Sequence, residues 1–181
     1  MKHYTLLFIS LLCLVACNDR QKTSNDPTGA DTTSVTPQTL PDSTLWGHLG
    51  EDTGMSALQF ITTNGDTLEL YRTDQYTGED GNLMGEIRNM SDRFAITISP
   101  DRESIRTAIN ASQLEEIWQK AETSPYNEWK LWNGHILLSS VQQQEIGAVN
   151  RIDTMDIMVL DQDSLVIRNH VGQIITFKGK K

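Results

Sequence analysis

The chain has 181 residues, with 15 Lys and Arg against 24 Asp and Glu, and a formal charge of −9. Acidity of this degree argues against nucleic-acid binding, which needs clustered basic side chains to replace counterions. Both cysteines, Cys13 and Cys17, stand near the N-terminus, so the rest of the chain has no thiol for a disulfide, a thiolate metal site or a cysteine nucleophile. We therefore expect packing to supply the stability.

The N-terminus has the parts of an export signal. Lys2 precedes the apolar run from Tyr4 to Ala16, and small or medium side chains come just before Cys17. A basic start, a short apolar core and small residues at the cleavage point are typical of secretory leaders. The run is shorter than the roughly 20 apolar residues that a membrane-spanning helix needs. We interpret residues 1–17 as a leader, with an ordinary secretory peptide or an N-terminal strand as the alternatives.

The tetrapeptide Leu14-Val15-Ala16-Cys17 resembles the lipobox of bacterial lipoproteins, and this resemblance covers the first 17 residues. It implies cleavage just before Cys17, a diacylglyceryl group on its thiol, and acyl chains such as palmitate. Each buried acyl methylene contributes about 0.8 kcal/mol and one chain alone holds only marginally, so the two or three chains typical of the family make attachment durable. The resemblance predicts a lipid-anchored protein of the cell envelope, in the outer membrane, and leaves the leaflet open.

The segment that follows has the composition of a tether. Residues 18–44 contain three prolines and many Ser, Thr and Asp, with almost no large apolar side chains. Such a segment cannot bury enough surface to offset the entropy of ordering, so we predict disorder. A coil of this length spans about 30 Å root-mean-square. Residues 45–181 are then an ordinary size for a β domain, with a seam between two β modules near residues 111–124.

Most of the remaining chain alternates with the period of two that is typical of strands. Met55 to Thr63 and Asp66 to Arg72 flank Asn64-Gly65, which predicts a hairpin with a type I′ turn. Leu83 to Met90 and Arg93 to Ser99 predict a second hairpin. The segment between these hairpins predicts a loop, and one more short strand is expected before residue 111.

One segment, near residues 113–122, breaks the strand rhythm. Ser112 is suited to cap a helix and Glu115 to bond back to it, which makes a capping box. Four apolar residues then recur at the spacing of one helical face. They are Leu114, Ile117, Trp118 and Ala121. We predict a short helix that packs this stripe on the sheet, plugging the end of a barrel or bridging two β modules.

The C-terminal part returns to strands. Glu128 to Trp132 and His135 to Ser140 flank Asn133-Gly134, another hairpin signal, and the polar run 142–145 predicts an exposed loop. Three further strands are expected, at Arg151 to Leu160, Ser164 to Asn169 and Gln173 to Lys178. The unbroken apolar run Leu165-Val166-Ile167 indicates a strand covered on both faces. Closely spaced strands predict a mainly β fold, an antiparallel meander that forms a small barrel or a sandwich.

The last third of the chain resembles the lipocalin-like lipoproteins of bacteria. The stretches that carry the likeness are Leu114 to Trp118, Arg151-Ile152 leading into Leu160-Asp161, Asp163 to Ile167, and Gly172 to Lys178. Two features depart from the family. Leu45-Trp46-Gly47 stands where Gly-x-Trp is expected, and the stretch after Leu114 is too short for an eight-stranded barrel unless earlier strands join it. The resemblance implies a β scaffold for a small apolar ligand, and no binding residue is carried over.

Candidate catalytic and metal-binding residues lack the spacing that their chemistry needs. His48, His135 and His170 have no metal-ligand spacing, such as i, i+4 on a helix, so solvated or hydrogen-bonded histidines are the better interpretation. Ser139 and Ser140 follow His135, but no Gly-x-Ser-x-Gly turn surrounds them. We predict no catalytic, cofactor-binding or metal-binding residue and no enzymatic activity.

Two other groups have a structural and a functional interpretation. The loop between residues 73 and 82 offers oxygen ligands without the ligand order of an EF-hand, so a solvated loop is favoured. These ligands are Asp74, Glu79, Asp80 and Asn82. Trp129 and Trp132 lie on opposite faces of one strand, so one at most is core, while the other either stacks on a sugar or lies at a rim.

Two function classes follow. The first is a binding or interaction lipoprotein whose β scaffold holds a small apolar ligand, a glycan or another envelope protein. The second is an envelope hydrolase, which requires convergent polar residues. The absence of catalytic spacing favours the first class. An internal cavity lined by Leu, Ile and Met would indicate a carrier, and a solid core would indicate an interaction module.

Overall fold

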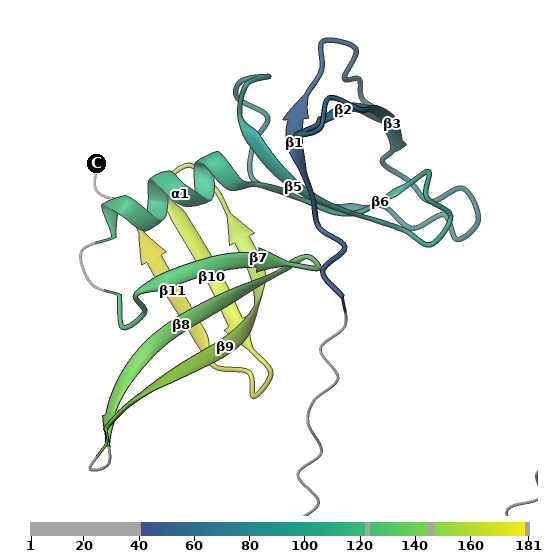
Figure 1. Ribbon diagram of the computed structural model, residues 1–181. Coiled ribbons are helices and arrows are strands. Elements are labelled where there is room, and N and C mark those ends of the chain that lie inside the picture. The colour runs from purple at the N-terminus through teal and green to yellow at the C-terminus, as the bar shows by residue number, and fades with distance from the viewer. Residues whose placement is uncertain (1–40, 122–123, 145–146, 180–181) are drawn as a thin grey trace, which may run out of the picture. The chain divides into compact units, whose positions relative to one another are not determined.

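The computed structural model describes residues 41–121, 124–144 and 147–179. The predicted leader, its Cys17 and nearly all of the predicted tether lie outside the described residues. Leu40–Lys181 forms one compact unit. Within it the chain is mainly β, as predicted, and its strands gather in two sheets with one short helix (Figure 1).

The first sheet has the strand order β3-β2-β1-β5-β6-β4. Its strands are β1 (Leu45–Leu49), β2 (Ala57–Thr62), β3 (Thr67–Tyr71), β4 (Asn82–Met84), β5 (Arg93–Ile98) and β6 (Ile105–Asn110). All pairs are antiparallel except β4 with β6. An isolated bridge between Tyr71 and Ser104 brings the end of β3 to the start of β6.

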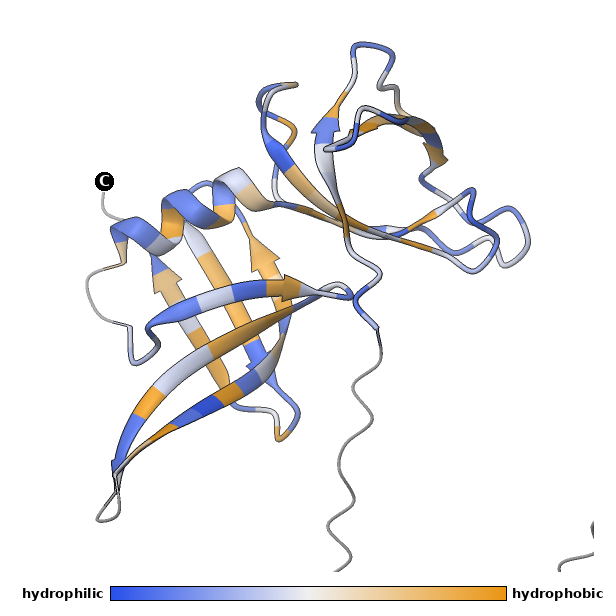
Figure 2. Cartoon of the chain, viewed as in Figure 1, coloured by the Kyte–Doolittle hydropathy of each residue, from blue (hydrophilic) through white to orange (hydrophobic). Residues whose placement is uncertain are grey.

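The second sheet is the predicted antiparallel meander, with the order β11-β10-β9-β8-β7. Its strands are β7 (Glu128–Trp132), β8 (His135–Gln144), β9 (Gly147–Leu160), β10 (Ser164–Asn169) and β11 (Ile174–Lys178). Figure 2 shows apolar residues alternating with polar ones along these strands. Across the described residues neither sheet closes into a barrel, so the sandwich-like alternative holds.

The central strands of the first sheet contribute to two apolar cores. In β5, Phe94 and Ile96 are fully buried in one core, while Ala95 between them belongs to the other. In β6, Ala108 and Ile109 divide in the same way. The second core also holds the inner face of the second sheet. β5 and β6 therefore lie between the two cores and join the sheets.

Helix α1 (Ala111–Lys120) follows β6 directly and packs on β5, β10 and β11 (Figure 1). The predicted apolar stripe is confirmed, because Leu114 and Ile117 are almost completely buried. The predicted capping box is wrong. Asn110 is the N-cap, and its side chain accepts the amide hydrogen of Gln113, while the hydroxyl of Ser112 accepts the amide hydrogen of Arg93.

The two Asn-Gly hairpins form as predicted, but their turns differ. Asn133 and Gly134 have φ angles of 49° and 83°, which suits the predicted tight turn between β7 and β8. At the other hairpin only Gly65 is left-handed, with φ of 89°, and its amide donates to the carbonyl oxygen of Thr62. The type I′ turn predicted there is therefore wrong, because Asn64 does not take the positive φ that this turn requires.

The second predicted hairpin, between residues 83–90 and 93–99, is also wrong. β4 has only three residues and pairs in parallel with β6, while β5 pairs with β1 and β6. Gly85 ends β4 with a φ of 88°. The next residue, Glu86, is then held by side chains at the start of α1: its amide donates to Gln113 and its carbonyl accepts from Asn110.

Two smaller predictions in the second sheet need correction. The polar run 142–144 is the end of β8 rather than a loop, because its residues pair with the start of β9. Both strands are exposed at this end, so strand pairing does not require apolar residues there. In β10, Leu165 and Ile167 are fully buried but Val166 is only half-buried. Only one face of this strand is therefore completely covered.

Candidate functional site

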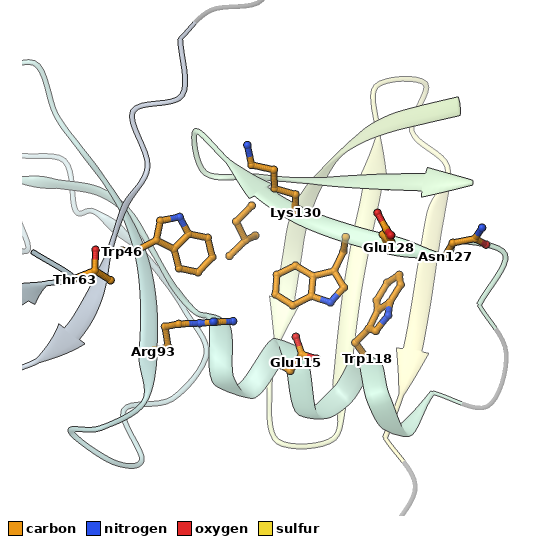
Figure 3. Close-up of a pocket in the computed structure, with 10 residues that line it drawn as sticks. Trp46, Thr63, Arg93, Glu115, Trp118, Asn127, Glu128 and Lys130 are labelled. Carbon is orange, nitrogen blue, oxygen red and sulfur yellow. The ribbon is translucent and has the colours of Figure 1, made fainter. Parts of the chain in front are cut away.

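An open groove of about 720 Å³ lies where α1, β7, β1 and β5 meet (Figure 3). We call it the tryptophan groove. It is lined by Trp46, Thr63, Arg93, Glu115, Trp118, Asn127, Glu128, Trp129, Lys130 and Leu131. The volume is within the range of ligand sites in proteins.

Three elements each supply one tryptophan, and each indole is half-buried. Trp46 is on β1, opposite Ala95 of β5. Trp118 is on the apolar stripe of α1, and its ring centroid lies 5.3 Å from that of Phe177. Trp129 is on β7 and packs against the second core. The core thus holds one side of these rings, and part of each ring reaches the groove.

Charged groups are arranged along the groove. The guanidinium carbon of Arg93 lies 5.2 Å from the ring centroid of Trp46, a cation–π contact. Figure 3 shows these two residues at one end and Glu128 at the other, with Glu115 between them on the helix. The groove therefore has a cationic end and an anionic part.

The chain leading into β1 is fastened beside the cationic end. The ammonium of Lys130 lies 3.3 Å from a carboxylate oxygen of Asp42. Burial by itself raises the pKa of Asp42, but hydrogen bonds from Thr44 and the charge of Lys130 outweigh this and lower it. Asp42 is therefore ionised at neutral pH and neutralises Lys130, which leaves Arg93 as the cation of this end.

In the part of the chain that the structure describes, the inner face of the second sheet is packed by α1 rather than hollow. Leu114 and Ile117 of α1 fill the space over this face and join one cluster with Leu131, Ile136 and Leu138. All five side chains are at most 2% exposed. A ligand in the tryptophan groove would therefore lie at the rim of the core, partly in contact with water.

Among the described histidines, His135 has a side-chain partner. Its Nδ1 lies 2.9 Å from a carboxylate oxygen of Asp156, and a guanidinium nitrogen of Arg168 lies 3.6 Å from the other oxygen. Nearly half of each of these side chains is exposed. Ser139 is four residues farther along β8 and pairs with Ile152, so the strand keeps it apart from His135.

The remaining sequence candidates do not gather. His48 is exposed on β1, and His170 is exposed in the turn after β10. Ser140 lies on β8 and is buried. Trp132 is half-buried at the end of β7, on the face opposite Trp129. Within residues 41–121, 124–144 and 147–179, no three His, Cys, Asp or Glu side chains form a group that could hold a metal ion.

The aspartates of the acidic loop accept hydrogen bonds from the loop itself. One oxygen of Asp74 accepts the amide hydrogens of Tyr76 and Thr77, at 2.8 and 3.0 Å. One oxygen of Asp80 accepts the hydroxyl hydrogen of Thr73 at 2.6 Å. These bonds hold the turn together, which agrees with the interpretation of a solvated structural loop.

The sequence singled out Trp129 and placed Trp118 in the helix stripe, but it did not associate either with Trp46 or Arg93. Trp118 and Trp129 are each 25 or more positions along the chain from Arg93 and from Trp46. Only the pairing of β1 with β5 and the packing of α1 bring them together. No local pattern in the sequence carries that information.

The comparison with protein families found a match to a family described as Lipocalin-like, over residues 119–180. The match begins at the end of α1 and covers β7 to β11, which is the whole second sheet. It confirms the resemblance of the C-terminal third and covers about a third of the chain. Comparison with curated proteins gave no match, and comparison with solved structures gave none either.

No helix in the described residues, including α1, is long and apolar enough to span a membrane.

Proposed function

We propose that the chain is a lipid-anchored binding protein of the bacterial cell envelope, and that the tryptophan groove holds its ligand. The observation that carries this is the convergence of three half-buried indoles from three elements on one open groove. Indoles already packed against a core offer flat apolar surface at low entropic cost. The match to a Lipocalin-like family over the second sheet supports a ligand-binding role.

The groove favours an amphipathic ligand. Its tryptophans suit an apolar ring or chain, and Arg93 suits an acidic group at one end. We further propose that the protein is not an enzyme, since the partnered histidine lies outside the groove. A glycan is the second candidate, because Asn127 and Glu128 place polar groups beside the indoles, as sugar hydroxyls require.

A fluorescent amphiphile tests the groove. Anilinonaphthalene sulfonate carries apolar rings and one anionic group, and we expect saturable binding to the full chain. Trp118→Ala or Trp129→Ala should weaken binding about two- to tenfold, the range of one aromatic contact. Trp132→Ala is the matched control, since it removes an indole from the opposite face of β7. Equal affinity in all four proteins would contradict the assignment, and binding of neutral oligosaccharides alone would favour the glycan.

The anchor is tested separately. We expect the wild-type protein to enter the detergent phase on phase separation, and Cys17→Ser to leave it or to accumulate as an uncut precursor. The basis is the lipobox-like Leu14-Val15-Ala16-Cys17, with two or three acyl chains needed for durable attachment. A wild-type protein that stays in the aqueous phase would refute the proposed attachment.

A further inference from the structure

Another cavity opens at one end of the first core and shares no lining residue with the tryptophan groove. We call it the Arg72 cavity. Its volume of about 280 Å³ lies just below the roughly 300 Å³ at which sites for drug-sized ligands begin. Leu58 and Ile105, which are 0% and 4% exposed, line it together with Leu83, which packs on the same core. The cavity therefore has an apolar floor and suits a small ligand.

Arg72 stands at an inward-facing position of the strand pair β2–β3. Its amide donates to the carbonyl oxygen of Ser56 at 2.9 Å, which continues the pairing that places Leu70 opposite Leu58. Side chains two residues apart on a strand share a face, so Arg72 faces the same side as Leu70. Leu70 is 1% exposed and belongs to the first core. A charged side chain thus occupies a position at which an apolar one is expected.

The guanidinium of Arg72 has no acceptor within residues 41–121, 124–144 and 147–179. Its Nε is buried without a hydrogen-bond partner, and no ion pair engages the side chain. Arginine carries five donors and no acceptor, and a buried donor left without an acceptor is destabilising. Because Arg72 lines the cavity, an acceptor bound there would remove this cost.

Asp80 brings the opposite charge to the same cavity. It is exposed, so it lies at the mouth, and one of its oxygens accepts the hydroxyl hydrogen of Thr73 at 2.6 Å. The next residue, Gly81, allows this close approach. Its amide donates to the carbonyl oxygen of Arg72 at 2.6 Å, and a Cβ there would clash with the carbonyl oxygen of Ile105. The missing side chain of Gly81 therefore lets the acidic loop reach the cavity.

The two charges of the cavity do not neutralise each other. In the described part of the chain, neither Arg72 nor Asp80 forms an ion pair, with the other or with a third group. A simple anion would be attracted by Arg72 and repelled by Asp80, and a simple cation would meet the reverse. A ligand that carries both charges satisfies both side chains.

We propose that the Arg72 cavity binds a free α-amino acid with an apolar side chain. The carboxylate accepts hydrogen bonds from the guanidinium of Arg72, which suits carboxylates because its donors form a planar fork. The ammonium donates to the second oxygen of Asp80. The apolar side chain lies against Leu58 and Ile105. This site goes beyond the ligand proposed for the tryptophan groove and does not depend on it.

Isothermal titration of the full chain with leucine and two of its fragments tests the ligand class. We expect saturable binding of leucine, methionine or phenylalanine. Two compounds keep the leucine side chain and lose one charge each: 4-methylpentanoate lacks the ammonium and 3-methylbutylamine lacks the carboxylate. Each should bind at least about tenfold more weakly, the effect of one charged hydrogen bond. Serine keeps both charges but has no apolar side chain, and it should also bind more weakly.

Three variants assign the binding to this cavity. Arg72→Met keeps the apolar stem and Asp80→Asn keeps an oxygen for Thr73, and each should weaken leucine binding at least about tenfold. Arg106→Gln is the matched control, because Arg106 is exposed on β6 and does not line the cavity. It should leave the affinity unchanged. Without ligand, Arg72→Met should not lower the melting temperature, since it removes a donor that has no acceptor among the described residues.

The outcomes separate this inference from the proposed function. If anilinonaphthalene sulfonate binds and none of the three amino acids does, the tryptophan groove stands, the cavity holds water only, and this inference is overturned. If leucine binds and the sulfonate does not, the reverse holds. Equal binding of 4-methylpentanoate and leucine would refute a zwitterionic ligand. A lower melting temperature of ligand-free Arg72→Met would show that the guanidinium serves the fold, and would also overturn the assignment.

Discussion

Substitution of Asn110 tests the structural junction between the two sheets. Its side chain is completely buried at the point where β6 becomes α1. The side-chain oxygen accepts the amide hydrogen of Gln113, as an N-cap does. The side-chain nitrogen donates to the carbonyl of Glu86 at 2.7 Å and to the carboxylate of Asp92 at 2.9 Å. One amide therefore fastens the helix to the chain before β5.

The cost of Asn110→Ala follows from these three bonds. Loss of an N-cap costs about 1 kcal/mol. Each bond from the nitrogen contributes about 0.5 to 1.5 kcal/mol, and the one to the Asp92 carboxylate lies at the high end because its partner is charged and only 8% exposed. Since bonds in one network are not additive, we expect about 3 kcal/mol less free energy of unfolding. Asn110→Ser keeps an oxygen for the cap and should recover about 1 kcal/mol of this.

Urea unfolding followed by tryptophan fluorescence measures the loss, and we expect the midpoint to fall by about 1 to 2 M. Ser112→Ala is the control that decides between the two caps. The capping-box pattern makes Ser112 the cap, whereas in the structure its hydroxyl accepts only the amide hydrogen of the exposed Arg93. Its loss should cost at most about 1 kcal/mol. A larger effect for Ser112→Ala than for Asn110→Ala would show that the helix begins where the local pattern put it.

Three further substitutions test other parts of the fold. Trp118→Ala should lower the free energy of unfolding by about 2 kcal/mol, less than for a fully buried indole, because the ring is only half-buried and loses mainly its contact with Phe177. An unchanged melting temperature would contradict this. Gly134→Ala should cost about 1 to 2 kcal/mol, since its φ is 83° and a threonine side chain lies 3.1 Å from the added Cβ. The hydrogen bond from Arg88 lowers the pKa of Glu116. This pair therefore stabilises the fold at neutral pH, and its contribution is lost as the pH falls through the lowered pKa. In Glu116→Gln, the free energy of unfolding should consequently fall less than in the wild type between neutral pH and about pH 3.

Sequence patterns correctly predicted the elements that depend on residues close together in the chain. Asn133-Gly134 can take two positive φ angles, so the turn between β7 and β8 forms wherever the flanking strands can pair. The stripe that begins at Leu114 requires only that one helical face be apolar, and the core accepts that face. The meander of the second sheet follows because each of its strands pairs with its neighbour in the sequence.

Predictions failed where a distant partner decides the outcome. Residues 83–90 alternate like a strand, yet only 82–84 pair, and their partner β6 is more than 20 residues away. The side chains of Asn110 and Gln113 then hold the backbone at Glu86. A capping box and a hairpin are both patterns within a few residues, so neither could show that Asn110 would serve the helix and this loop together.

Periodicity also fails to show which faces of β5 are covered. Phe94 and Ile96 alternate with Ala95 and Thr97, which resembles a strand with one apolar face, but all four are buried. A small residue such as Ala95 fits the second core closely, while the larger ones fill the first. Both cores therefore use one strand, and the order in which the two sheets are joined cannot be inferred from an alternation of large and small residues.

The tryptophan groove arises from this junction and not from any motif. Trp46 and Arg93 project from the β1–β5 pair toward the second core, while Trp129 lies on the terminal strand of the meander. A sheet edge is normally protected by a charge, a bulge or a covering segment. At β7 the edge is covered at Leu131, which is fully buried, and the tryptophan groove lies beside it. The half-buried indoles at this junction, rather than the packed interior, are therefore where we expect the proposed ligand to bind.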